Sequence, residues 1–156
     1  MSMAIAVAIQ ACGDDNATIV QSTTPVVATP DPIEGLWQSA VTIRDCTSGA
    51  TVTTFRGLTD FHRGGTATAD NNQPSTTKGV AMGVWSRGAT GLYTFNTRFW
   101  RYLVDATPAG SQRFTRVITL STDGLTPTST ISAQIFDNND NVVQTICGVE
   151  TSTKVG

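Results

Sequence analysis

Residues 112–154 read QRFTRVITLSTDGLTPTSTISAQIFDNNDNVVQTICGVETSTK, and this stretch decides the fold. It contains three runs, 112–121, 128–137 and 142–154, that mix apolar and polar residues without a helical repeat. The breaks between them, Asp123-Gly124 and DNNDN at 137–141, are made of residue types that favour turns. Connections this short join antiparallel strands, whereas parallel strands need long crossovers. The stretch therefore predicts three consecutive strands of an antiparallel meander.

The same pattern continues through the earlier part of the chain. No segment keeps a 3.6-residue apolar repeat for more than two turns. Eight extended runs are predicted in all: 35–45, 50–62, 65–71, 78–87, 92–106, 112–121, 128–137 and 142–154. A meander of this size leaves two exposed edges unless it closes, and a barrel of eight strands can hold one small ligand. The sequence predicts an all-β protein, an eight-stranded antiparallel up-and-down meander closed into a barrel.

The cysteines provide a second argument for closure. Cys46 lies at the end of the first run and Cys147 lies in the last. These two reach disulfide distance only if the first and last strands are neighbours, as they are in a closed barrel. A disulfide between them would also fit an exported protein. The alternative is a pair of free thiols.

Composition and motifs exclude several functions. The chain has 156 residues, 14% of them charged, and a net charge of −2, so a basic nucleic-acid surface is not expected. Neither a Cys-x-x-Cys motif nor a Gly-x-Ser-x-Gly motif is present. The single histidine, His62, shares a strand face with Asp60 and reads as a surface residue beside a turn. The segment 137–141 superficially resembles a calcium loop but reads as a hairpin turn. We assign no catalytic residue, metal or cofactor.

Two short motifs resemble those of a known family. Gly35-Leu36-Trp37 at the start of the first run resembles the Gly-x-Trp motif of lipocalins and the wider calycin group, and Gly83-Val84-Trp85 repeats it. The resemblance covers residues 33–155 in the order of its strands. It implies a lipocalin-like barrel whose Trp packs across the closed end and whose interior binds a small molecule.

The N-terminus carries a resemblance of its own. Ile9-Gln10-Ala11-Cys12 follows an apolar run and is similar to the lipobox of bacterial lipoproteins, in which the cysteine receives a lipid. Because residues 13–32 are rich in Thr and Pro, they read as a flexible tether. We expect a signal-peptide remnant and lipobox at 1–12, the tether at 13–32 and a barrel domain at 33–156. The protein would then lie in the cell envelope, touching the membrane only through its lipid, or be secreted.

The run 92–104 is the most unusual of the eight. Both of its faces are aromatic and each carries an arginine, so one face is expected to fill the barrel while the other meets a partner, or a bulge re-aims the strand. Arginines beside aromatic rings can hold an anionic or aromatic ligand; the alternative is arginine packing over aromatic side chains. The predicted ligand-binding residues are Trp37, Trp85, Arg98, Phe99, Trp100, Arg101, Tyr102 and Arg116.

Three functions remain open on these grounds. The first is a cell-envelope (lipo)protein that binds a small hydrophobic or anionic molecule in its barrel. The second is a structural or assembly subunit, a homo-oligomer formed through the run 92–106 or through an N-terminal segment that adds to a neighbour's sheet. The third is an isomerase or cyclase that works by shaping a cavity, a role that fold analogy alone suggests.

Overall fold

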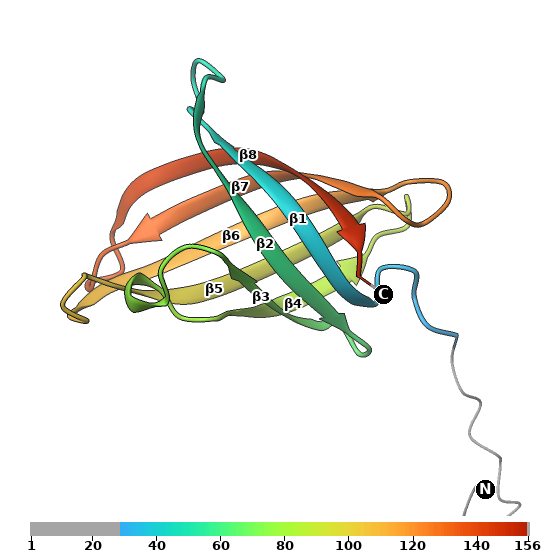
Figure 1. Cartoon of the computed structure of the whole chain (residues 1–156), viewed down its shortest axis with the longest axis horizontal. Coiled ribbons are helices and arrows are strands. Elements are labelled where there is room, and N and C mark those ends of the chain that lie inside the picture. Colours follow the sequence, from blue (N-terminus) through green and yellow to red (C-terminus); the bar gives the residue numbers. More distant parts are fainter. Residues whose placement is uncertain (1–28, 156) are drawn as a thin grey trace, which may run out of the picture.

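The chain forms a closed barrel of eight antiparallel strands, described for residues 29–155 by a computed structural model (Figure 1). Each strand pairs with the next one along the chain, and β1 also pairs with β8, from Trp37 opposite Lys154 to Arg44 opposite Cys147. The predicted all-β, closed up-and-down meander is confirmed. The strands are β1 (Gly35–Arg44), β2 (Thr51–His62), β3 (Thr66–Asn71), β4 (Ala81–Arg87), β5 (Tyr93–Tyr102), β6 (Pro108–Leu120), β7 (Pro127–Phe136) and β8 (Val142–Lys154).

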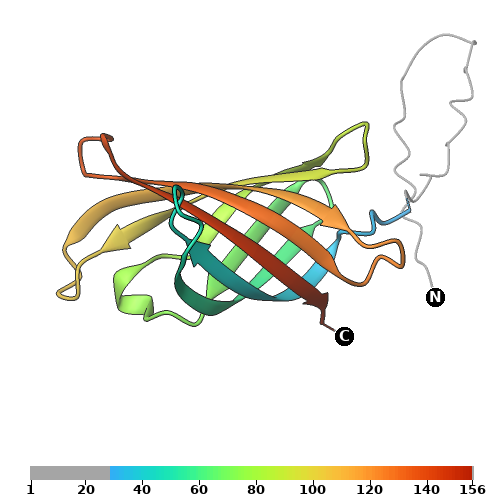
Figure 2. The ribbon, with the colours of Figure 1, turned by 90° about the horizontal axis from the view of Figure 1, so that it is seen from above.

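Helical structure is confined to one short turn within residues 29–155. This turn, η1 (Ser75–Thr77), lies in the connection between β3 and β4. Within the described part of the chain, no helix is long and apolar enough to cross a membrane. The barrel seen from above in Figure 2 is thus built from the sheet alone.

Alternation along each strand fixes which residues face the interior. On β1, Trp37, Ser39 and Val41 are buried while the residues between them are exposed. On β5, Tyr93 and Phe95 are buried in the same way. This period of two is the signature of a sheet with one face on the core and the other in water.

The two ends of the barrel differ. At the end where β1 starts, a dense core surrounds Trp37, which is 1% exposed, and its aromatic rings meet edge to face. Residues 31–34, which we call the plug, cover this core: Ile33 is fully buried, and Trp37 Nε1 donates to the Ile33 carbonyl oxygen at 2.7 Å. The plug closes this end of the barrel, and the termini of the described chain lie beside it (Figure 1).

The glycine of the second Gly-x-Trp triplet lies where β4 and β5 approach each other closely. A Cβ added at Gly83 on β4 would lie 2.0 Å from the Asn96 carbonyl oxygen on β5. Trp85, two residues later, packs edge to face against Phe61 and donates from Nε1 to the His62 carbonyl oxygen at 3.0 Å. The glycine thus lets β4 approach β5, and the tryptophan joins the closed-end core.

Three strands, β4, β5 and β6, differ from the sequence-based prediction by more than one residue at a boundary. The strand β4 starts at Ala81 instead of at 78. The run predicted at 112–121 is a longer strand, β6, that starts at Pro108, and the pairing of β5 with β6 shifts register between Trp100 and Tyr102. This irregularity is the kind of bulge that the sequence allowed for in the run 92–104. It also shortens β5, which ends at Tyr102 instead of continuing to 106.

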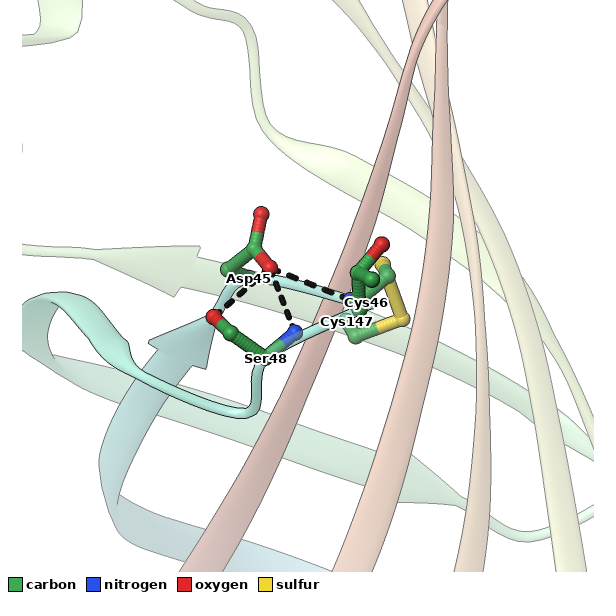
Figure 3. The surroundings of a disulfide bond; sticks show 5 residues. Asp45, Cys46, Ser48 and Cys147 are labelled. Carbon is green, nitrogen blue, oxygen red and sulfur yellow. Dashed lines mark hydrogen bonds between the residues drawn. A yellow bond between two sulfur atoms is a disulfide. The ribbon is translucent and has the colours of Figure 1, made fainter.

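The predicted disulfide is present where the barrel closes. Cys46, just beyond β1, is bonded to Cys147 on β8, and their Cα atoms lie 5.2 Å apart (Figure 3). Asp45 orders the adjoining turn by accepting hydrogen bonds from the Ser48 N–H at 2.7 Å and the Ser48 hydroxyl at 2.8 Å. These bonds and one from the Thr47 N–H hold the pKa of Asp45 below its usual value. Cys12 and the predicted lipobox lie outside the described residues.

Candidate functional site

A cavity of about 340 Å³ occupies the end of the barrel opposite the plug. It lies where β1, β3, β5 and β7 end and where β2, β4, β6 and β8 begin. Its size falls within the range of small-molecule sites, which is roughly 300–1,000 Å³. The barrel is therefore hollow at one end and filled at the other.

The walls of the cavity are mainly apolar. They come from alternate positions of nearly every strand, so the period-two burial that builds the closed-end core continues into a lined hollow. The apolar lining residues include Val41, Ile43, Phe55, Ala69, Ala81, Phe99, Phe114, Ile131, Ala133 and Ile146. Such walls favour an apolar ligand, since burying apolar surface is worth roughly 25 cal/mol per Å².

Arg116 lines the base of the cavity and forms an ion pair with Glu150, which lies beneath it. Arg116 on β6 faces inward, and its Nε lies 3.1 Å from Oε2 of Glu150 on β8. Arg116 Nη1 donates to the Thr59 hydroxyl at 2.9 Å, and the Ser129 hydroxyl donates to Glu150 Oε2 at 3.0 Å. We call Arg116, Glu150, Thr59 and Ser129 the floor. It separates the cavity from a void of about 10 Å³ above Trp37 and Ile33.

The floor is held in a dry environment. The Glu150 side chain is 2% exposed and that of Arg116 is 10% exposed. Burial lowers the pKa of the Arg116 guanidinium, and the negative charge of Glu150 acts in the opposite direction. The guanidinium also lies over two rings, 5.0 Å from the Phe114 centroid and 5.5 Å from that of Phe95. Charge pairing and ring contacts together keep a cation inside the barrel.

The contact between Arg116 Nε and Glu150 is an ion pair without hydrogen-bond alignment. Among residues 29–155, Arg116 Nε is a buried atom that lacks a hydrogen-bond partner, although a carboxylate oxygen lies 3.1 Å away. The attraction is therefore mainly between charges. Because a guanidinium carries five N–H donors, Arg116 still has donors to offer a ligand above it.

The rim of the cavity also carries paired charges. Lys78, just before β4, reaches back to Asp70 on β3, and its side chain is 8% exposed. The hydrogen bond from Lys78 is the main cause that lowers the pKa of the Asp70 carboxyl. Arg44 and Asp45 at the end of β1 add one charge of each sign to the lining. The mouth thus has no excess of either sign.

The structure separates the residues predicted to bind a ligand. Phe99 and Arg116 line the main cavity, whereas Trp37 lies beneath the floor and Trp85 lies in the closed-end core. The other four lie along a second groove of about 400 Å³ beside the β5–β6 bulge; they are Arg98, Trp100, Arg101 and Tyr102. The binding role of all eight stays a prediction.

The second groove lies outside the barrel. Trp100 is 55% exposed, and the Arg98 guanidinium stacks 4.6 Å from the centroid of its ring. Arg98 and Arg113 share the carboxylate of Asp140, at 3.5 and 3.1 Å. The arginines thus pack over aromatic and acidic neighbours on the surface, an arrangement that is compatible with either of the two roles predicted for them.

The floor contains residues that sequence reasoning missed. Glu150 was not singled out, and neither were its neighbours Thr59 and Ser129. A signal was present, because Glu150 falls on the same strand face as Ile146, which lines the cavity, and Gly148, which is buried. The meeting of Glu150 with Arg116 depends on the tilt of the barrel, which brings together side chains from strands that are not adjacent.

The remaining candidate motifs lie on the surface. His62 Nε2 is 3.5 Å from Asp60, and both side chains are well exposed. Asp137 caps a hairpin turn by accepting from the Asn139 and Asn141 N–H groups. In residues 29–155, no group of three His, Cys, Asp or Glu side chains is placed to hold a metal ion.

The fold and site define a hollow β-barrel with an apolar cavity, open at one end. No protein-family model matches the chain, and a search of the curated proteins finds no match either.

Proposed function

We propose that the protein binds a small apolar molecule in the open-end cavity of its barrel. The observation that carries this proposal is the contrast between the two ends: one is plugged and packed, while the other encloses about 340 Å³ between apolar walls. A barrel needed only for stability gains nothing from an empty end, since voids forfeit packing contacts. An apolar hollow with one polar group at its base is the usual design of a ligand site.

The closed end supports a calycin-like assignment. Trp37, from the first Gly-x-Trp triplet, packs across the plugged end, as the family resemblance implies. We propose that the chain is a calycin-like or lipocalin-like barrel. The role proposed here rests on the cavity itself and not on the family.

The disulfide supports a place outside the reducing cytosol. Disulfides persist in exported and envelope proteins and are rare elsewhere. Together with the lipobox-like segment that ends at Cys12, this favours a cell-envelope protein with a lipid anchor. Metabolic labelling with a fatty acid in a bacterial host tests the anchor: the wild-type chain should take up label and Cys12→Ser should not. An unlabelled wild-type chain would remove the anchor from this proposal.

The other two functions receive less support. Within residues 29–155 every strand has a neighbour on both sides, and the start of β2, residues 51–55, pairs only with β1. The closed sheet therefore offers little edge for a segment of another copy to join. An isomerase or cyclase would use the same cavity, and its apolar walls already account for binding. We therefore propose neither.

Filling the cavity tests the proposed function. Ala133 on β7 faces the cavity, whereas the next residue, Gln134, is exposed on the outside of the barrel. Ala133→Phe should abolish binding of 1-decanol, measured by calorimetric titration, because the ring occupies the space of the ligand. Gln134→Phe adds the same bulk outside and should bind as the wild type does. Circular dichroism establishes that both variants are folded.

A further inference from the structure

Resting on the proposed function, we propose that the cavity selects electrically neutral ligands: an apolar chain or ring system with one uncharged oxygen, such as a hydroxyl, ether or carbonyl, held at Arg116. A carboxylate of the same size is excluded. An unpaired arginine at the base of an apolar cavity would favour an anionic ligand. Here the arginine is paired with Glu150, and this pairing reverses the preference.

The first step is that the charge of Arg116 is already compensated. Glu150 lies 3.1 Å from its guanidinium, and both groups are shielded from water. A ligand carboxylate entering this site meets a pair with no net charge. It gains little attraction from the arginine because the glutamate beside it repels the second anion.

The second step is that Glu150 is fixed in place. Ser129 donates to its Oε2 at 3.0 Å, and Ser152 lies 3.3 Å from Oε1 and 3.2 Å from the Ser39 hydroxyl. Both carboxylate oxygens therefore have hydroxyl partners in addition to the arginine. A ligand carboxylate cannot displace Glu150 without breaking these contacts in a buried site.

The third step concerns the rest of the lining. Lys78 is the other deeply set cation, and it is paired with Asp70. Arg44 at the rim is followed directly by Asp45 in the same lining. Apart from Arg116, whose charge Glu150 compensates from beneath the cavity, the lining holds two cations and two anions. No uncompensated positive charge therefore draws in an anion or offsets the loss of its hydration.

A neutral oxygen meets none of these obstacles. It leaves water at a much lower cost than a carboxylate does. It can accept one of the guanidinium N–H groups that Thr59 and Glu150 leave unused. The apolar part of the ligand then lies against Phe99, Phe114 and the aliphatic walls.

Matched ligands test the inference on the wild-type protein. 1-Decanol and methyl decanoate are neutral, and decanoate carries the same chain with a negative charge. In calorimetric titrations at neutral pH, both neutral ligands should bind, and decanoate should bind at least about tenfold more weakly, a difference of roughly 1.4 kcal/mol. Equal or tighter binding of decanoate would overturn the neutral-ligand inference while leaving the proposed function standing. Binding of none of the three would overturn both.

A substitution in the floor provides the second test. Glu150→Gln removes the countercharge and keeps the shape of the side chain, so decanoate should gain on decanol by at least about tenfold, close to 1.4 kcal/mol. Asp140→Asn is the matched control, because it removes a carboxylate from arginines outside the barrel and should leave the preference unchanged. An unchanged preference in a folded Glu150→Gln variant would contradict the inference. If that variant does not fold, the wild-type titrations decide.

Discussion

Tyr93 shows how a single residue ties the plug to the barrel. Its side chain lies in the closed-end core, and its hydroxyl donates to Asp31 Oδ1 at 2.6 Å. Arg87 lies 3.7 Å from the other oxygen of Asp31 and above the Tyr93 ring. Burial, followed by the hydrogen bond to Asp31 and the charge of that group, raises the pKa of Tyr93 to about 12.

The pH dependence of stability tests this contact. A tyrosine whose pKa is higher in the folded state than its unfolded value of about 10 stabilises the fold fully below pH 10. This stabilisation is lost as pH rises through about 12. Tyr93→Phe should therefore lower the free energy of unfolding by about 1.5 kcal/mol near neutral pH, where the hydrogen bond to a carboxylate is intact.

Urea denaturation of both proteins across the pH range gives the measurement. The gap between wild type and Tyr93→Phe should shrink between about pH 10 and pH 12, because only the wild type has this hydroxyl to ionise. All other residues are the same in the two proteins, so the comparison isolates the Tyr93 hydroxyl. If the difference in unfolding free energy stays constant up to pH 12, folding does not raise the pKa of Tyr93.

For single residues, the sequence predicts the sheet face of a side chain more readily than the partner that the side chain contacts. Because Arg113 and Arg116 are three residues apart on one strand, alternation places them on opposite faces, and the structure has Arg113 beside the surface residue Asp140 and Arg116 inside. The partner of Arg116 was not predictable, because Glu150 is brought to it by barrel tilt and stagger. The alternation of side chains along a strand determines which face a residue lies on. It does not determine which residues of non-adjacent strands lie at the same level along the barrel axis.

At the scale of elements, the join between β1 and β8 brings the two ends of the meander together. The pairing from Trp37–Lys154 to Arg44–Cys147 ends next to the disulfide, which links residues 101 positions apart. In the chain-entropy model, a loop of about 100 residues corresponds to roughly 4.7 kcal/mol of stabilisation, exerted on the unfolded chain. The disulfide and the backbone hydrogen bonds therefore both hold β1 against β8.

Removing the disulfide should weaken the barrel without changing its topology. The double variant Cys46→Ser/Cys147→Ser should lose about 2–5 kcal/mol of unfolding free energy, because its unfolded chain regains the freedom that the link removes. Urea denaturation measures the loss. Adding a reductant should bring the wild type to the same stability and leave the double variant unaffected. If the double variant is as stable as the wild type, the backbone pairing of β1 with β8 is sufficient without the disulfide.

The strand boundaries predicted from turn-forming residues are close to the observed ones, except where contacts with a neighbouring strand override the local turn preference. The runs 35–45, 65–71 and 142–154 match β1, β3 and β8 closely, since Gly and Asn turns bound them. The residues 108–111 (PAGS) read as a turn but begin β6. Gly110, with φ of 90°, lies so close to β7 that an added Cβ would be 2.0 Å from the Phe136 carbonyl oxygen. A glycine needed for strand contact resembles one needed for a turn.

At the scale of the whole molecule, the barrel divides its tasks between two ends. The closed end combines the plug, the aromatic core and the contacts of Asp31, and it contains most of the fully buried side chains. The open end leaves its interior unfilled. Arg116 and Glu150 lie between the two, so stability and binding depend on different sets of residues on the same strands.

This division predicts that the two properties can be changed separately. Ile33 in the plug is fully buried, and Ile33→Ala should lower the free energy of unfolding by about 2–4 kcal/mol through lost burial and a cavity at the closed end. The affinity for 1-decanol should change less than about twofold, since the floor stands between Ile33 and the ligand. Ala133→Phe should show the reverse, with lost binding and a folded barrel.

Paired measurements of urea denaturation and calorimetric titration on the two variants decide the matter. The titrations are run well below the denaturation midpoint of Ile33→Ala, so that partial unfolding does not reduce the apparent affinity. A folded Ile33→Ala variant with tenfold weaker binding would show that the plug shapes the cavity through the floor. The Arg116–Glu150 pair would then transmit strain between the ends, because Ile33 and Glu150 line the same small void.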